Sequence, residues 1–164
     1  MQFYNTYNMK RIVYLFALLA LMVSCEEPDP HRAAMEQYAK EHIATPDTYK
    51  FNYMGIEKEY KYVNELYTLR KGLEEQMAKA ADKAAYQDQI DKIDALFPEV
   101  GYDVACYEYS LYFWYMGGQT GKMKLEGVVL ARYDADGNLL VMTMDPDSLP
   151  TYPALQMLRD QGKL

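Results

Sequence analysis

The chain has 164 residues, of which 50% are hydrophobic and 25% are charged, and its formal charge is −7. This length suits about one domain of ordinary size, and the apolar fraction excludes a wholly disordered chain. The 17 basic residues against 24 acidic ones argue against a nucleic-acid partner, because phosphate binding needs a basic face. Two cysteines and two histidines leave little material for a metal or thiol enzyme, so we expect no metal site and no cofactor.

A secretory signal is predicted near the N-terminus. Lys10 and Arg11 precede an uncharged apolar run of 12 residues, 12–23, and the signal starts naturally at Met9. The run is too short to cross a bilayer core as a helix, which takes about 20 residues. It fits the apolar segment of a secretory signal. The alternatives are a signal peptide without lipidation and a membrane helix.

The apolar run ends in Met22-Val23-Ser24-Cys25, which resembles the lipobox of bacterial lipoproteins. The resemblance implies cleavage before Cys25, a diacylglycerol on its thiol and a further acyl chain on the freed amine. Two or more acyl chains hold a protein stably on a membrane, whereas one does so only marginally. We therefore expect residues 1–24 to be a removed signal peptide. The mature protein is expected to be anchored in the cell envelope through Cys25, at the outer membrane.

Residues 25–31 are polar, acidic and interrupted by prolines, and they are predicted to form an extended tether. The acidic residues Glu26 and Glu27 directly after the cysteine resemble surface-export signals of Bacteroidota lipoproteins. A solvated spacer is the alternative, so the periplasmic and surface-facing sides both stay open. Residues 32–164 are expected to form a single domain without an internal repeat.

The first half of this domain is predicted to be mainly helical. Apolar residues at helical spacing indicate a helix over 32–44, and Thr45-Pro46 ends it. A strand is predicted over 49–57, with Tyr49, Phe51 and Tyr53 alternating against polar residues. Residues 58–97 carry a helical pattern that would extend ~60 Å as one straight helix. We expect a hairpin broken near Ala81-Asp82, and the alternative is a protruding arm that recruits a partner.

The second half is predicted to be a β-meander. Strands are expected over 102–115, 122–133 and 139–144, joined by a glycine-rich loop and by the hairpin loop 134–138. Pro153 begins a short terminal helix that ends near Gly162. The expected fold is α+β: an antiparallel meander of three to four strands packed against an N-terminal helix and an inserted helical hairpin.

Three short segments have only a superficial likeness to a calcium site, a phosphate-binding loop and a nucleophilic cysteine. The loop 134–138 resembles a calcium loop, but Thr143 stands where the EF-hand glutamate should be. The segment 117–122 lacks the GxxxxGK[ST] pattern, because Met123 follows Lys122. Cys106 has no neighbouring base in the sequence and is expected to be a buried small hydrophobe.

The abundance of tyrosine is the one compositional anomaly. Seventeen tyrosines are present, and 14 of them follow residue 24. Tyrosine is both a strong strand former and an amphipathic contact residue, so a structural and a binding role are both open. In the strand 102–115, Glu108 and Ser110 mark one face as polar, and Tyr112 and Trp114 share that face. We expect Tyr112 and Trp114 to be partly exposed and available to a ligand.

The chain as a whole resembles the small envelope lipoproteins of Bacteroidota. The resemblance covers the lipobox, the helix leading to Thr45-Pro46-Asp47-Thr48-Tyr49, and the strand, Gly-Gly, strand, Asp-Gly, strand order over 102–144. It implies no catalytic residues. Two hypotheses follow: a non-enzymatic module that binds an envelope protein or a glycan, and an envelope hydrolase that uses a carboxylate pair invisible in the sequence.

Overall fold

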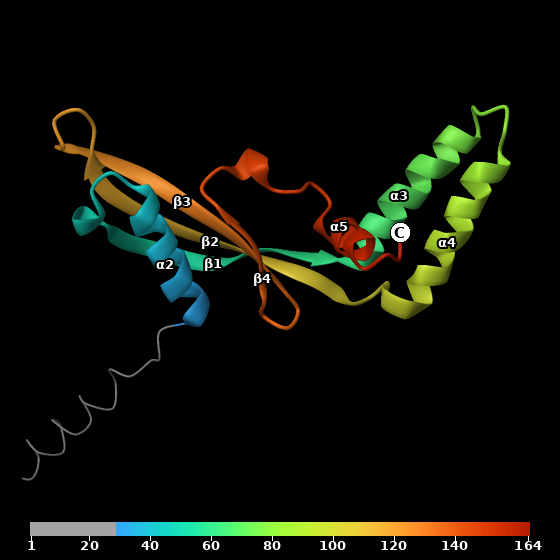
Figure 1. The fold of residues 1–164 in the computed structure, drawn as a ribbon, viewed down its shortest axis with the longest axis horizontal. Coiled ribbons are helices and arrows are strands. Elements are labelled where there is room, and N and C mark those ends of the chain that lie inside the picture. The colour runs from blue at the N-terminus through green and yellow to red at the C-terminus, as the bar shows by residue number, and fades with distance from the viewer. Residues whose placement is uncertain (1–28) are drawn as a thin grey trace, which may run out of the picture. The chain divides into compact units, whose positions relative to one another are not determined.

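The computed structural model describes residues 29–164, so the predicted signal peptide, Cys25 and the first residues of the tether lie outside the described residues. Residues 34–164 form one compact unit. Four helices and a four-stranded antiparallel sheet make up the described part of the chain, which confirms the α+β class and the meander (Figure 1). In this part of the chain, no helix combines the length and the apolar character that crossing a membrane requires.

The sheet has the order β1-β2-β3-β4, with β1 at Lys50–Lys61, β2 at Val104–Gly117, β3 at Met123–Asp134 and β4 at Leu139–Thr143. As predicted, β3 and β4 pair antiparallel through the Asp136-Gly137 loop, with Tyr133 opposite Leu139. Gly137 has a φ of 85°, which a residue without a side chain adopts at little cost. A local turn signal therefore determines this register.

Helix α2 occupies Pro30–His42 and begins two residues before the predicted start. The reason lies in local chemistry, since proline is tolerated in the first turn of a helix and the Asp29 carboxylate accepts a hydrogen bond from the His31 N–H at 2.9 Å. The prediction that Pro30 and His31 belong to an extended tether is therefore wrong. A short 3-10 helix, η1, follows α2 at Pro46–Thr48 and leads into β1.

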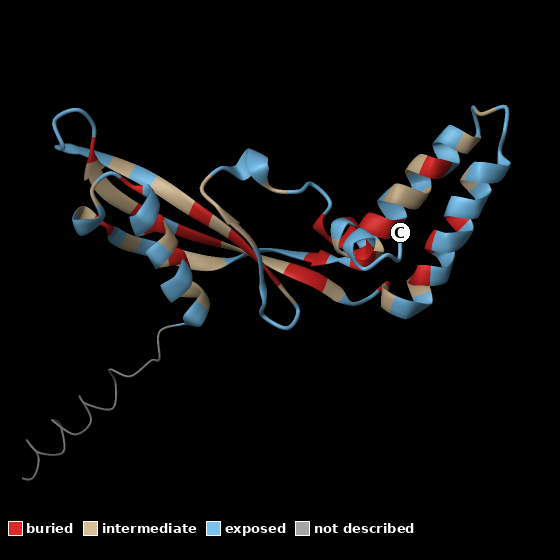
Figure 2. Cartoon of the chain, in the orientation of Figure 1, coloured by how far each residue is buried: buried red, intermediate tan, exposed pale blue. Residues whose placement is uncertain are grey.

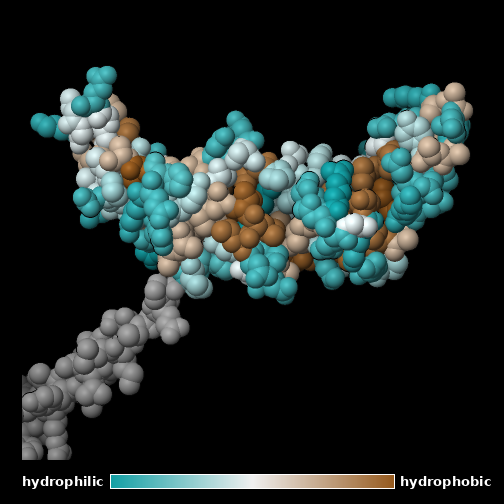
Figure 3. Space-filling view, viewed as in Figure 1, coloured by the Kyte–Doolittle hydropathy of each residue, from teal (hydrophilic) through white to brown (hydrophobic). Residues whose placement is uncertain are grey.

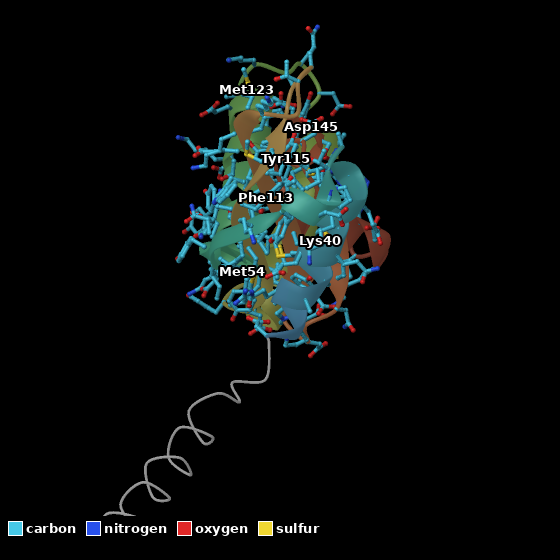
Figure 4. The ribbon with its side chains drawn as sticks, turned by 90° about the vertical axis from the view of Figure 1, so that its left-hand side faces the viewer. Lys40, Met54, Phe113, Tyr115, Met123 and Asp145 are labelled. Atoms are coloured by element: carbon cyan, nitrogen blue, oxygen red, sulfur yellow. The ribbon has the colours of Figure 1, made fainter. Side chains whose placement is uncertain are left out.

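From Ala34 onward, α2 covers one face of the sheet. Met35 and Ala39 of the helix, both fully buried, pack with Leu111, Phe113 and other residues of the sheet. In Figure 4, α2 with Lys40 lies on one side of the sheet, and side chains on the opposite side point away from it. We call this cluster the α2 core; its buried members are Met35, Ala39, Ile43, Tyr49, Leu111, Phe113, Val129, Ala131 and Tyr133.

The predicted helical hairpin is present as α3 at Tyr62–Met77 and α4 at Ala84–Val100. It breaks where the sequence predicts, and the Asp82 carboxylate accepts a hydrogen bond from the Ala84 N–H at 3.0 Å. The predicted helix start at residue 58 is wrong, because β1 continues to Lys61. Lys58 and Tyr60 pair with residues of β2, and this long-range pairing overrides local helix propensity.

A second core joins the hairpin to the terminal helix α5, which occupies Pro153–Asp160. Both arms of the hairpin bury apolar side chains against each other and against α5, whereas Ala105 is the buried contribution of the sheet. Figure 2 shows the buried residues of the hairpin on the inner sides of its arms. The base of the hairpin is therefore packed, which favours the core role over a free arm. A short 3-10 helix, η2, at Pro146–Ser148 connects β4 to α5.

Candidate functional site

The structure leaves Tyr112 and Trp114 accessible on the face of the sheet opposite α2. Tyr112 is 39% exposed and Trp114 is half-buried, whereas the adjacent residues Leu111 and Phe113 are buried in the α2 core. Successive side chains of a strand point to opposite faces, which explains the alternation. The prediction that both aromatics stay partly exposed is confirmed, and their role in binding stays a prediction.

Tyr53 of β1 extends this aromatic surface, although the alternation in the sequence predicts that it shares a face with Tyr49 and Phe51. Tyr53 lies directly opposite Tyr112, and their rings stack with centroids 6.3 Å apart and planes 26° apart. A register shift between Phe51 and Tyr53 causes the difference, because an extra residue in one strand reverses the alternation after it. We call Tyr53, Tyr112 and Trp114 together the aromatic face.

Polar groups surround the aromatic face. The Tyr112 hydroxyl donates a hydrogen bond to the Glu57 carboxylate at 3.2 Å, and the Lys124 ammonium lies 5.3 Å from the centre of the Trp114 ring. Gly55 lets the Tyr53 ring lie over the backbone of β1, since a Cβ at this position would collide with the Tyr53 hydroxyl. Glu126 lies directly opposite Trp114 on β3, and Lys124 pairs with it at 3.4 Å. The aromatic rings therefore lie beside two carboxylates, Glu57 and Glu126, and one ammonium, all of which can form hydrogen bonds with a ligand.

Glu108 and Ser110, the polar residues from which the exposure of Tyr112 and Trp114 is predicted, are not themselves open to solvent. Ser110 is only 1% exposed, and the Glu108 side chain is 14% exposed. Glu108 and Ser110 do mark the polar face, as predicted, but the structure largely buries both side chains. The end of the face at Glu108 carries a buried ionic network, and the aromatic face lies beyond it along β2.

Arg132 of β3 is the centre of this buried network. Its side chain donates to the Glu108 carboxylate at 2.7 Å, to the Tyr60 hydroxyl at 3.0 Å and to the Pro150 carbonyl at 2.6 Å. Tyr60 in turn donates to Glu108 at 3.1 Å. The network thus joins three strands to the segment between η2 and α5. We call these four residues the Arg132 network.

Glu65 of α3 is a second buried carboxylate. It is 7% exposed, and its Oε2 accepts a hydrogen bond from the Leu155 N–H at 3.0 Å, in the first turn of α5. Burial raises the pKa of the Glu65 carboxyl above its usual range, and the hydrogen bonds from α5 oppose this shift. Glu65 therefore caps α5 across the second core.

Cys106 is fully buried, as predicted. Burial raises the pKa of its thiol to about 11, so the thiol stays neutral at physiological pH. A nucleophilic cysteine needs an accessible thiolate, and Cys106 has neither the charge nor the exposure. The structure therefore supports its interpretation as a small hydrophobic residue.

The calcium-like loop 134–138 is a hairpin turn organised by Asp134. Its carboxylate accepts hydrogen bonds from the N–H groups of Asp136 and Asn138 and from the Asn138 side chain, at 2.8–3.0 Å. The side-chain bond from Asn138 holds the pKa of Asp134 below its usual range. Over residues 29–164, no three metal-ligating side chains of the His, Cys, Asp or Glu type are grouped. Asp134 thus stabilises the hairpin turn through these hydrogen bonds.

Three pockets lie around the helical hairpin, away from the aromatic face. They have volumes of 630, 470 and 250 Å³. Asp94 is the carboxylate residue that lines one of these three, and it is bound by Arg70 at 2.7 Å. Comparisons with protein-family models, with curated protein sequences and with solved structures find no match for this chain.

Proposed function

We propose that this protein is a lipid-anchored protein of the bacterial cell envelope that binds glycans through the aromatic face. The observation that carries the binding part is the open surface of Tyr53, Tyr112 and Trp114 on the sheet face opposite α2. The anchoring part rests on the sequence, where Ser24-Cys25 follows an apolar run. The outer membrane is the expected address, and either side of it fits the acidic residues after Cys25.

A glycan suits the aromatic face better than an apolar ligand does. The C–H groups on one side of a pyranose ring form an apolar patch that stacks on an electron-rich aromatic ring. Tyr112 and Trp114 are two residues apart on one strand, so their side chains emerge about 7 Å apart. Glu57 and Lys124 beside the rings can bond the hydroxyl groups at the edge of a sugar.

The hydrolase alternative calls for two facing carboxylates in a cleft. Of the three described pockets, one has a carboxylate residue in its lining, and that residue, Asp94, is engaged by Arg70. Glu65 and Glu108 are held by Leu155 and Arg132 within the protein. These contacts are structural, and they favour the binding module over the enzyme.

The binding proposal predicts that Tyr112→Ala combined with Trp114→Ala lowers glycan affinity at least tenfold. Loss of two stacking rings should remove more than ~1.4 kcal/mol of binding free energy, because aromatic anchors carry much of the energy of such surfaces. The measurement is screening of the wild-type protein on a glycan array, followed by calorimetry of the best ligand with both proteins.

The matched control is Tyr67→Ala combined with Tyr102→Ala on the hairpin side of the molecule. Tyr67 is 64% exposed and Tyr102 is 86% exposed, so this variant also removes two exposed aromatics. We expect it to bind like the wild type. Equal affinity of the Tyr112/Trp114 variant and the wild type, with both folded by circular dichroism, would refute the proposed site.

A further inference from the structure

A groove runs between α5 and the two arms of the helical hairpin. One part of it has a volume of 630 Å³ and a second part 250 Å³, and both are lined by Leu69, Leu73 and Arg159. The larger volume falls within the range of about 300–1,000 Å³ that is typical of small-molecule sites. We call these two adjoining pockets the helical groove.

The floor of the helical groove is apolar and continuous with the second core. Leu73 of α3 and Ile93 of α4 are buried core residues that also line the groove, and Leu69 packs against them. Figure 3 shows a strip of hydrophobic surface over the space between α5 and the hairpin arms. The groove therefore opens directly onto aliphatic side chains, which favours an apolar chain as the occupant.

The rim of the same groove is basic, although the protein as a whole is acidic. Lys92, Arg159 and Lys163 supply the charged side chains that line the larger part, and Leu164, with the terminal carboxylate of the chain, lines it as well. Lys92 pairs with Asp88 at 2.8 Å and Lys163 with Glu99 at 2.6 Å, so both lysines are partly neutralised. Arg159 has no ion pair with any residue in the described range 29–164, and its guanidinium remains available to an anion.

We propose that the helical groove binds a single-chain anionic amphiphile, with the apolar chain on Leu69, Leu73 and Ile93 and the carboxylate or phosphate head on Arg159. Arg159 favours an anionic head group, because a guanidinium pairs bidentately with planar or tetrahedral oxyanions. The apolar floor decides the tail. This site is separate from the aromatic face, so its failure would leave the glycan proposal intact.

The test is equilibrium binding of a fluorescent long-chain carboxylate, cis-parinarate, to the full chain carrying Cys25→Ala. That substitution removes the proposed acylation site, so no attached acyl chain can compete with the probe for the groove. We expect saturable binding at micromolar concentration and at least tenfold weaker binding of Arg159→Gln. Lys71→Gln, an exposed cation on α3 that does not line the groove, should bind like the parent. Leu69→Asn should also weaken binding, since it makes the floor polar.

Two further competition experiments test whether the anionic head group is required and whether the ligand is a free amphiphile or a membrane lipid. On the parent protein, the methyl ester of the acid should displace the fluorescent probe at least tenfold less well than the acid does. On Arg159→Gln, the ester and the acid should displace the probe equally well. Lysophosphatidate should compete like the acid, because it offers the same anionic head on one chain. Binding of the acid and its ester with equal affinity would overturn the proposal, as would binding only to vesicles of anionic phospholipid.

Discussion

Arg132→Ala is expected to lower the free energy of unfolding by about 3–5 kcal/mol, because it removes one partner of a buried ion pair. The Arg132 side chain is 5% exposed and the Glu108 side chain 14% exposed. After the substitution, the Glu108 carboxylate loses its bond from Arg132. Within the Arg132 network it keeps one hydrogen bond, from the Tyr60 hydroxyl. The Pro150 carbonyl also loses its donor, which weakens the attachment of the segment before α5.

Urea denaturation followed by circular dichroism measures this loss. The informative control is the double variant Arg132→Met with Glu108→Leu, which removes both charges and keeps similar volumes. Replacing a buried ion pair by apolar residues is often nearly neutral or stabilising, so this variant should be much more stable than Arg132→Ala. If Arg132→Ala costs less than ~1 kcal/mol, the pair behaves like an exposed surface salt bridge and the network is not a determinant of stability.

Cys25→Ala is expected to move the protein from the membrane fraction to the soluble fraction and to abolish acyl labelling. Each buried methylene of an acyl chain contributes about 0.8 kcal/mol to membrane attachment, so the loss of the proposed acyl chains should release the protein. Residues 25–164 contain 15 basic and 24 acidic residues, a formal charge of −9. This charge is repelled by anionic headgroups and would not replace the proposed acyl anchor.

Metabolic labelling with a palmitate analogue and fractionation of lysed cells measure this effect. Cys106→Ala is the matched control, because it removes the other cysteine, which is buried in the fold. We expect Cys106→Ala to be labelled and membrane-bound like the wild type. Labelling that persists in Cys25→Ala, or membrane retention at the wild-type level, would contradict lipidation at Cys25.

Features determined by local sequence could be predicted, whereas those formed by long-range pairing could not. The break of the hairpin at Ala81-Asp82 and the turn at Asp136-Gly137 depend on neighbouring residues, and both predictions are confirmed. The predicted start of α3 at residue 58 is too early, because strand pairing with β2 extends β1 to Lys61. Helix propensity alone carries no information about that partner.

The candidate site shows the same division. Alternation within β2 is enough to separate Tyr112 and Trp114 from the neighbouring core residues Leu111 and Phe113. Tyr53 was missed because the register shift after Phe51 depends on how β1 pairs with β2. Arg132 was missed because its partners Tyr60 and Glu108 are 72 and 24 residues away in the chain. A lone arginine in a strand gives no sign that it is buried.

A fluorescence titration of Trp114 tests the binding claim most directly. The chain contains one tryptophan, so its emission reports on the aromatic face without interference from another indole. If glycans bind at the aromatic face, the best ligand from the glycan array should change Trp114 emission saturably, with the affinity found by calorimetry. It also predicts that Tyr112→Ala weakens this response. A glycan that binds by calorimetry and leaves Trp114 emission unchanged would contradict binding at the aromatic face, as would the absence of any glycan ligand.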